Sequence, residues 1–300
     1  MTSPYSAAIQ GWYACHARDL PWRQPDATPW SIMVSEFMLQ QTPVGRVLPA
    51  HAAWLDRWPE PAALAAASPA DAVRQWDRLG YPRRAVRLHA SAELITSRHG
   101  GRVPAAAEEL LALPGVGPYT AAAIASFAFG RRHAVLDTNV RRVLARLVTG
   151  QSLPRPAPTA AEQRLAESLL PADGKAAARW SVGVMELGAL ICTATRPRCA
   201  ECPLAGRCAW LARGRPAAPA RRGQPAYDGS DRQCRGRILA ILRGATGPVP
   251  ASSLTAAWND SAQRTRALAA LINDGLVIRC ADDSVALPGD GPSAAPGPSR

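Results

Sequence analysis

The sequence predicts a mainly α-helical protein that ends in a small mixed module of helices and a hairpin. Three observations support this fold class. Up to about residue 212 the apolar residues recur with helical spacing, the breaks fall at Pro and Gly, and no alternating run indicates a strand. Beyond residue 230, two helical segments precede a segment with hairpin character. The apolar content of 47% is sufficient for a sizeable core.

The helical part contains several recognisable segments. SIMVSEFMLQQT (31–42) is apolar nearly all round, which is typical of a buried helix, and leaves a polar stripe of Ser35, Glu36, Gln40 and Gln41. Helices are expected at about 105–112 and 119–129. A further helix begins at LDTNVRR (136–142) and carries an apolar face formed by Val140, Val143, Leu144 and Leu147.

The C-terminal part has a different composition. Residues 213–230 are basic and contain proline, so they predict a linker. Residues 231–289 then predict a small winged-helix-like module. Its expected elements are helices at 231–243 and 261–274 and a two-stranded hairpin at 275–289. Residues 290–300 (DGPSAAPGPSR) are expected to be a disordered tail.

The charge balance indicates a polyanionic partner. Lys and Arg number 35 against 23 Asp and Glu, which gives a net charge of +12 and favours nucleic acid over a membrane surface. Lys175 is the single lysine. No apolar run approaches the ~20 residues that a membrane helix needs, and no secretory signal is visible, so a soluble intracellular protein with no membrane partner is expected.

Four of the seven cysteines are crowded into a C-x6-C-x2-C-x5-C pattern, formed by Cys192, Cys199, Cys202 and Cys208. The odd total and the clustering exclude a secreted disulfide framework. Four thiolates on so short a loop can converge on one metal ion or one cluster, and the spacing alone leaves zinc and iron–sulfur equally open. Arg196 and Arg198 lie in the first interval, where they either contact DNA phosphates or belong to an ordinary solvated turn.

LPGVGPYT (113–120) separates two of the expected helices. Pro114 ends the first helix, and Gly115 and Gly117 allow a tight turn and close backbone approach. The second helix then begins with free N–H groups, which can bind a phosphate without reading a base. The alternative is a purely structural turn.

Two carboxylates have positions suited to chemistry. Glu36 lies on the helix that should be buried, and a carboxyl without hydration favours its protonated form, as a general acid near neutral pH requires. The alternative is a structural glutamate held by local hydrogen bonds. Asp137 begins a helix, where an N-cap is the simplest interpretation; the functional alternative is an anion that faces a cation formed during the reaction.

Together these motifs closely resemble those of the helix-hairpin-helix DNA glycosylases, specifically the adenine glycosylases of the MutY type, over roughly residues 8–212. The resemblance implies a fold of two helical lobes: a six-helix domain at 22–132, and a domain of 1–21 with 133–212 that holds a [4Fe–4S] cluster on the four clustered cysteines. It therefore favours iron–sulfur over zinc. It also implies a monomer that acts on double-stranded DNA in the bacterial cytoplasm, associated with the nucleoid.

The resemblance further implies a reaction and its residues. A monofunctional enzyme would excise adenine mispaired with 8-oxoguanine or guanine after flipping it out of the stack. Glu36 matches the general acid, and Asp137 matches the carboxylate that stabilises the sugar cation, supported by Tyr119 and Asn139. The wall of the adenine pocket matches Arg18, Leu20, Trp22 and Arg23. The residues that penetrate the duplex and contact the opposite base match Gln41, Thr42, Leu79 and Tyr81.

Related subfamilies supply the alternatives. Lyases of the endonuclease III type carry a lysine where this chain has Tyr119, and Lys175 lies outside every active-site motif. Thymine-mismatch glycosylases resemble the chain at Tyr119 and Asp137 but are expected to lack the glutamate at position 36. A non-catalytic iron–sulfur DNA-binding protein is the alternative from another class.

Two departures from the family pattern stand out. Val182 occupies a position where many members have Glu or Gln near the adenine. The C-terminal module is too short for the usual 8-oxoguanine-recognition domain and resembles the shortened adenine glycosylases of high-GC Gram-positive bacteria. Arg235, Arg237 and Arg243 make this module a candidate DNA or protein contact, and a solvated helix face is the alternative.

Overall fold

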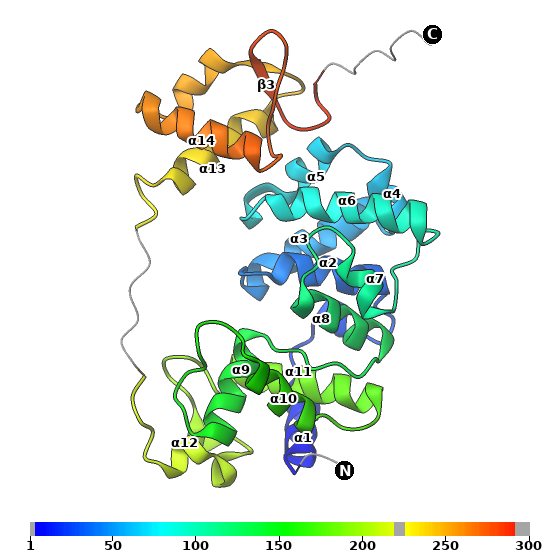
Figure 1. Ribbon diagram of the computed structural model, residues 1–300, viewed down its shortest axis with the longest axis vertical. Helices are drawn as coiled ribbons and strands as arrows, with labels where there is room; N and C mark the ends of the chain where they lie inside the picture. Colours follow the sequence, from blue (N-terminus) through cyan, green and yellow to red (C-terminus); the bar gives the residue numbers. More distant parts are fainter. Residues whose placement is uncertain (1–3, 219–225, 292–300) are drawn as a thin grey trace. The chain divides into compact units, whose positions relative to one another are not determined.

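The computed structural model describes residues 4–218 and 226–291, which form two compact units (Figure 1). Of the described residues, the first unit comprises 4–36, 104–112 and 116–218, and the second comprises 37–103, 113–115 and 226–291. The domain boundaries expected from the sequence remain a prediction. In the part of the chain that the structure describes, no helix combines the length and apolar character needed to span a bilayer. The mainly helical fold class is confirmed.

The first unit is helical. Its elements are α1 (Ser6–His16), η1 (Pro21–Arg23), most of α2 (Pro29–Leu39), α7 (Ala107–Leu111), α8 (Pro118–Phe129), α9 (Thr138–Leu144), the π-helical turn η3 (Ala145–Thr149), α10 (Ala160–Leu169), α11 (Gly174–Leu190), η4 (Cys199–Glu201), η5 (Ala205–Arg207) and α12 (Ala209–Ala212). Asp173 caps the N-terminus of α11 by accepting from the Ala176 N–H.

Helix α11 packs against both α1 and α9 to form the core of this unit. The apolar face predicted for the helix after Asp137 is buried in this core, together with Ile9, Trp180, Val184 and Leu187. Two glycines of α11 allow the close packing. A Cβ at Gly183 would lie 2.7 Å from the Cγ2 atom of Ile9, and one at Gly188 would lie 2.7 Å from the Cβ atom of Asn139. A larger residue at either position would push a neighbouring helix away.

The second unit contains a helical part and the C-terminal module. Its elements are α3 (Val44–Arg57), α4 (Pro61–Ala65), α5 (Pro69–Trp76), η2 (Asp77–Leu79), α6 (Arg83–Arg98), α13 (Asp231–Gly244), β1 (Val249–Pro250), η6 (Ala251–Ala257), α14 (Ser261–Asn273), β2 (Ile278–Arg279) and β3 (Ser284–Ala286). Trp54 is fully buried and contacts the rings of Trp58 and Trp76 edge-on, at centroid distances of 4.7 and 5.5 Å. Ser68 and Asp71 form a capping box that begins α5.

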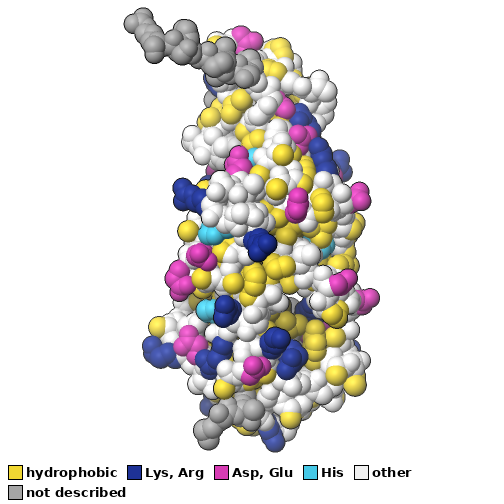
Figure 2. Space-filling model, turned by 90° about the vertical axis from the view of Figure 1, so that its right-hand side faces the viewer, with side chains coloured by type: hydrophobic (Ala, Val, Ile, Leu, Met, Phe, Trp, Pro, Cys, Tyr) yellow, Lys and Arg dark blue, Asp and Glu magenta, His cyan; other side chains and the backbone are white. Residues whose placement is uncertain are grey.

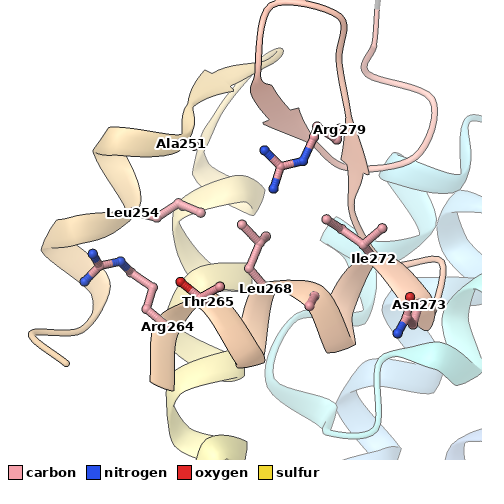
Figure 3. A pocket seen from close by; sticks show the side chains of 9 residues that line it. Ala251, Leu254, Arg264, Thr265, Leu268, Ile272, Asn273 and Arg279 are labelled. Carbon is pink, nitrogen blue, oxygen red and sulfur yellow. The ribbon is translucent and has the colours of Figure 1, made fainter. Parts of the chain in front are cut away.

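The C-terminal module has the element order of a winged helix. Strand β3 pairs antiparallel with both β1 and β2, so the sheet order is β1-β3-β2. The predicted helices and hairpin correspond to α13, α14 and β2–β3, whereas β1 and η6 were not predicted. A groove of about 400 Å³ lies between η6, α14 and β2 (Figure 3). Leu254, Leu268 and Ile272 line it, and Arg264 and Arg279 contribute charge.

The predicted linker and tail fall partly on residues that the structure describes. Residues 213–218 and 226–230 of the linker are described, and 219–225 lie outside the described residues. Within the predicted tail, Asp290 is described and forms an ion pair with Arg74 of α5. Residues 292–300 of that tail lie outside the described residues.

Candidate functional site

Glu36 lies on the buried helix α2, with 5% of its surface exposed. Tyr119, in the first turn of α8, hydrogen-bonds the carboxyl group, whereas Oε2 has no hydrogen-bond partner among the described residues. Burial raises the pKa of Glu36 to about 7; the Tyr119 hydrogen bond opposes this rise, nearby Asp137 adds to it, and Arg23 opposes it. The side chain is therefore an acid that can hold a proton near neutral pH and has one oxygen available.

Asp137 caps the N-terminus of α9, as the simplest interpretation of the sequence predicts. Its Oδ1 accepts the Val140 N–H at 2.6 Å, and its Oδ2 accepts the Asn139 side-chain amide at 2.8 Å. Burial raises the pKa of Asp137, whereas the Val140 and Asn139 hydrogen bonds and the positive charge of Arg142 oppose the rise. These hydrogen bonds and this charge favour the ionised form of Asp137.

Tyr119 acts electrostatically on both carboxylates. Burial raises its pKa well above 10, and the negative charges of Glu36 and Asp137 raise it further, so the hydroxyl stays neutral and donates. The structure thus brings Glu36, Tyr119, Asp137 and Asn139 together, as the resemblance implied. Lys175, the single lysine, is exposed at the beginning of α11, with its Cγ packed on Gly130.

The expected pocket wall is organised by a residue that the sequence did not single out. Leu20 and Trp22 are buried, and the two pocket arginines converge on Glu186 of α11, which is fully buried. Arg18 donates from Nε and Nη2 to the two carboxylate oxygens, both at 2.7 Å, and Arg23 donates from Nη1 at 2.9 Å.

Glu186 is held as an anion by these arginines. Burial alone would raise its pKa, but the hydrogen bonds and charges of Arg18 and Arg23 outweigh burial and lower the pKa to about 2. Since the charge of Arg23 also acts on Glu36, the pocket wall lies near the acid. Val182, the departure noted in the sequence, is half-buried one turn earlier on α11. No local sequence pattern distinguishes Glu186 from a surface glutamate.

The residues expected to contact the opposite base lie in the second unit, on two loops. Helix α2 ends at Leu39, so Gln40 and Gln41 do not extend its polar stripe, contrary to the sequence prediction. Gln41 and Tyr81 both adopt left-handed backbone conformations, with φ of 59° and 48°, and both are exposed. Leu79 is buried at 5% exposure.

Arg84 connects these two loops, and no sequence motif indicates this role. Its Nη1 donates to the carbonyls of Phe37, Met38 and Gln40 at 2.6–2.8 Å. Its Nη2 donates to the Gly80 carbonyl at 2.8 Å and the Thr42 hydroxyl at 2.9 Å. Burial lowers the pKa of Arg84 to about 10, so it remains charged at neutral pH. Thr42 and the carbonyls of Gly80 and Tyr81 are therefore held around one buried cation.

The glycine hairpin contains one glycine that the fold itself requires. Gly115 has φ of +83°, and a Cβ there would lie 2.9 Å from both the Arg87 Cβ and the Phe37 Cε1 atoms. Gly117 is the N-cap of α8 without a side-chain cap, and a Cβ there would meet none of the described atoms within 4 Å. The open space at Gly117 is compatible with the predicted approach of a phosphate.

The cysteine loop fits an iron–sulfur cluster in its donor set. Cys192, Cys199, Cys202 and Cys208 form no disulfide and interact with one another electrostatically, and burial raises the pKa of Cys202 to about 11. Among the described residues no three His, Cys, Asp or Glu side chains form a site for a single metal ion. Ligands on different irons of a cluster need not meet at one point, as ligands of a single ion must.

Two buried arginines hold the beginning of this loop. Arg146 donates from Nη1 to the Cys192 sulfur at 3.4 Å and the Thr193 carbonyl at 2.7 Å. Arg142 donates to the Cys192 carbonyl at 2.7 Å and the Asn139 side-chain oxygen at 2.7 Å. Arg142 therefore contacts both the cysteine loop and the residue that supports Asp137.

The exposed surface of the cysteine loop is less uniform than expected. Arg196 is exposed, whereas Arg198 pairs with Glu201 at 3.0 Å and donates to the Leu190 carbonyl at 2.8 Å. On the face drawn in Figure 2, basic side chains are spread among acidic and apolar ones and do not form a single patch.

Two family models match this chain. Residues 34–171 match the HhH-GPD superfamily base excision DNA repair protein model, and residues 192–208 match the iron-sulfur binding domain of endonuclease III. An adenine DNA glycosylase of Mycobacterium tuberculosis is 52% identical, with 94% of this chain and 93% of the relative covered. The adenine DNA glycosylase of Mycolicibacterium smegmatis is 49% identical, with 96% and 97% covered. A thermostable thymine-DNA glycosylase structure is 29% identical with a TM-score of 0.63, covering 70% of this chain and 95% of that one.

Proposed function

The chain belongs to the adenine DNA glycosylases of the HhH-GPD base excision repair superfamily, and on this basis we propose that it removes adenine mispaired with 8-oxoguanine or guanine. It is a hydrolase that acts on DNA and carries a [4Fe–4S] cluster. The observation that carries the proposed mechanism is the buried carboxyl of Glu36, which has an unpartnered oxygen and a pKa of about 7.

Glu36 donates its proton to the flipped-out adenine, so that the base leaves as a neutral molecule when the bond between the sugar and the base breaks. The ionised Asp137 nearby favours the protonated form of Glu36 before the reaction. Tyr119 orients the acid through its hydrogen bond. Water then adds to the sugar carbon and leaves an abasic site.

Asp137 stabilises the positive charge that develops on the sugar. Its two oxygens are held by Val140 and Asn139, so the anion does not need to reorganise during the reaction. No amine takes part, because Tyr119 stands at the position of the lyase lysine and the single lysine, Lys175, is exposed at the beginning of α11. The enzyme is therefore expected to be monofunctional.

The adenine is recognised by the wall of Leu20 and Trp22 with Arg18 and Arg23, which Glu186 keeps in place. The loops that carry Gln41, Thr42, Leu79 and Tyr81 contact the opposite base, and the exposed side chains of Gln41 and Tyr81 enter the duplex. The hairpin at Gly115 and Gly117 and the loop with Arg196 and Arg198 bind phosphates, and the four clustered cysteines are the cluster ligands that hold this loop. The protein acts as a monomer.

The test is a glycosylase assay with purified protein on duplexes in which adenine faces 8-oxoguanine, guanine, cytosine or thymine. Release of adenine, fastest opposite 8-oxoguanine, with an alkali-labile site and no spontaneous strand break, is expected. Loss of release in Glu36→Gln would support the assigned acid, and full activity of that variant would contradict it.

A second candidate is removal of mismatched thymine, favoured by the similarity to the thymine-DNA glycosylase structure. Thymine is a better leaving group than neutral adenine and does not need the buried acid. Duplexes with G:T mispairs distinguish the two functions, because thymine release that persists in Glu36→Gln would indicate this second activity.

A further inference from the structure

The C-terminal module, residues 231–291, has no part in the chemistry proposed above. It is nevertheless joined by ion pairs to the part of the second unit that carries Leu79 and Tyr81. These ion pairs lie on both sides of the segment 77–82, which connects α5 to α6.

On the α5 side, the guanidinium of Arg74 forms two contacts with the carboxylate of Asp290, one of them at 3.1 Å from Nη1 to Oδ1. Arg74 also donates to the Ala245 carbonyl at 2.7 Å. A residue of the module also donates to α5: Arg243 of α13 forms a hydrogen bond with the Val73 carbonyl at 3.1 Å. The Asp290 side chain is only 10% exposed, so this pair is partly shielded from solvent.

On the α6 side, Arg83, the first residue of the helix, pairs with Asp274 at 3.1 Å. Asp274 follows α14 and also pairs with Arg235 of α13. A third contact is made by Gly289, which has φ of +97° and lies so close to α5 that a Cβ would be 3.1 Å from the Ser68 Cβ atom. The module therefore contacts α5 at its start and along its length, and α6 at its start.

The segment between these contacts has an unfavourable backbone conformation. Asp77 and Tyr81 have φ of 41° and 48°, and Gly80 has φ of 90°. Residues with side chains adopt such conformations only where their surroundings hold them. Arg84 provides part of this support, because its guanidinium donates hydrogen bonds to the Gly80 and Tyr81 carbonyls. The contacts of the module with Arg74 and Arg83 flank the segment on both sides.

We propose that the C-terminal module is a positioning element for the segment 77–82, and that it sets the preference of the enzyme for the base opposite the adenine. This inference rests on the proposed contact of Leu79 and Tyr81 with that base. The module acts through these two residues and does not contact the base itself. In this way the short C-terminal module would control the choice of the opposite base.

The arginines that made this module a candidate for direct contact are engaged elsewhere. Arg235 pairs with Asp274, Arg243 donates to Val73, and Arg237 lies over the Trp258 ring at 5.2 Å. These contacts hold the module together or attach it to α5. They favour a positioning role over direct binding by α13.

The experiment uses the full-length, cluster-loaded protein and the variants Asp290→Asn and Asp274→Asn. Asp283→Asn is the matched control, because it breaks the Arg279–Asp283 pair inside the module without touching α5 or α6. Two quantities are measured: hydrogen exchange of the amides of residues 77–82, and the ratio of single-turnover adenine release opposite 8-oxoguanine to release opposite guanine.

We expect faster exchange at 77–82 and a ratio lowered about fivefold, equivalent to ~1 kcal/mol, in both variants and not in the control. Asp290→Glu should restore the ratio. Unchanged exchange overturns the proposal, and faster exchange with an unchanged ratio overturns its link to base choice. If the wild-type protein shows no preference between the two bases, the proposed 8-oxoguanine preference fails, and the exchange measurement still decides whether the module holds the segment.

Discussion

Substitution of Glu36 by Gln should strongly reduce adenine release and should make the stability of the protein less dependent on pH. The folded protein holds the pKa of Glu36 at about 7, against an ordinary value of 4.5. Between these two pH values the folded state binds a proton that the unfolded state has lost. The free energy of unfolding therefore falls as the pH rises through this window, and becomes constant above it.

The magnitude follows from the two pKa values. The full cost of burying this acid is ~3 kcal/mol above pH 7, and ~2 kcal/mol of it appears between pH 5.5 and 8. A glutamine does not titrate, so the difference in stability between Glu36→Gln and the wild-type protein should grow by about 2 kcal/mol in favour of the variant over this range. The absolute difference also includes the cost of a buried amide near Tyr119, which is independent of pH.

The assay is urea-induced unfolding at pH 5.5, 6.5, 7.5 and 8, with single-turnover adenine release measured on the same samples. Adenine release should fall by a factor of about 10² to 10⁴ in the variant, the usual contribution of a general acid. Glu108→Gln changes an exposed glutamate of α7 and is the control; its stability should follow that of the wild-type protein at every pH.

A stability difference that does not change with pH would refute the reasoning, because it would mean that Glu36 titrates alike in the folded and unfolded chains. In the wild-type protein the same pKa should appear as a decrease in adenine release above about pH 7, where the acid loses its proton.

Three further outcomes follow from the site. Asp137→Asn should reduce adenine release by about 10² or more yet leave the melting temperature nearly unchanged, because Asn also caps helices; a large loss of stability would instead favour the purely structural interpretation. Glu186→Gln should lower the free energy of unfolding by ~2 kcal/mol, as expected for hydrogen bonds to charged groups, and weaken adenine binding, seen as a higher KM in steady-state kinetics. Borohydride added during turnover should trap no covalent DNA adduct, and Lys175→Ala should be fully active; a trapped adduct would contradict a monofunctional reaction.

Much of the helical fold could be predicted from the sequence, because apolar periodicity and the Pro and Gly breaks report directly on local structure. The helix around Glu36 is one example, although its end was placed too late. The apolar pattern does not show that Gln41 turns into a left-handed conformation, because that turn is held by Arg84, 43 positions further along the chain.

In the candidate site, too, local motifs reveal some residues and leave others unrecognised. Glu36, Tyr119 and Asp137 were found because they stand in compact motifs that resemble a family. Glu186, Arg84, Arg142 and Arg146 were missed, because each is a buried charge whose partners are distant in sequence. In a chain with so many arginines, nothing local separates the few that accept burial from the many that remain in solvent.

The exposed position of Lys175 has a practical consequence. The chain offers one side-chain primary amine, at the start of α11, besides its N-terminal amine. An amine-reactive fluorophore would therefore attach at a single defined side chain, with no engineered cysteine and no reagent that attacks the cluster thiols. Individual molecules labelled in this way could be followed by fluorescence microscopy as they search along stretched DNA.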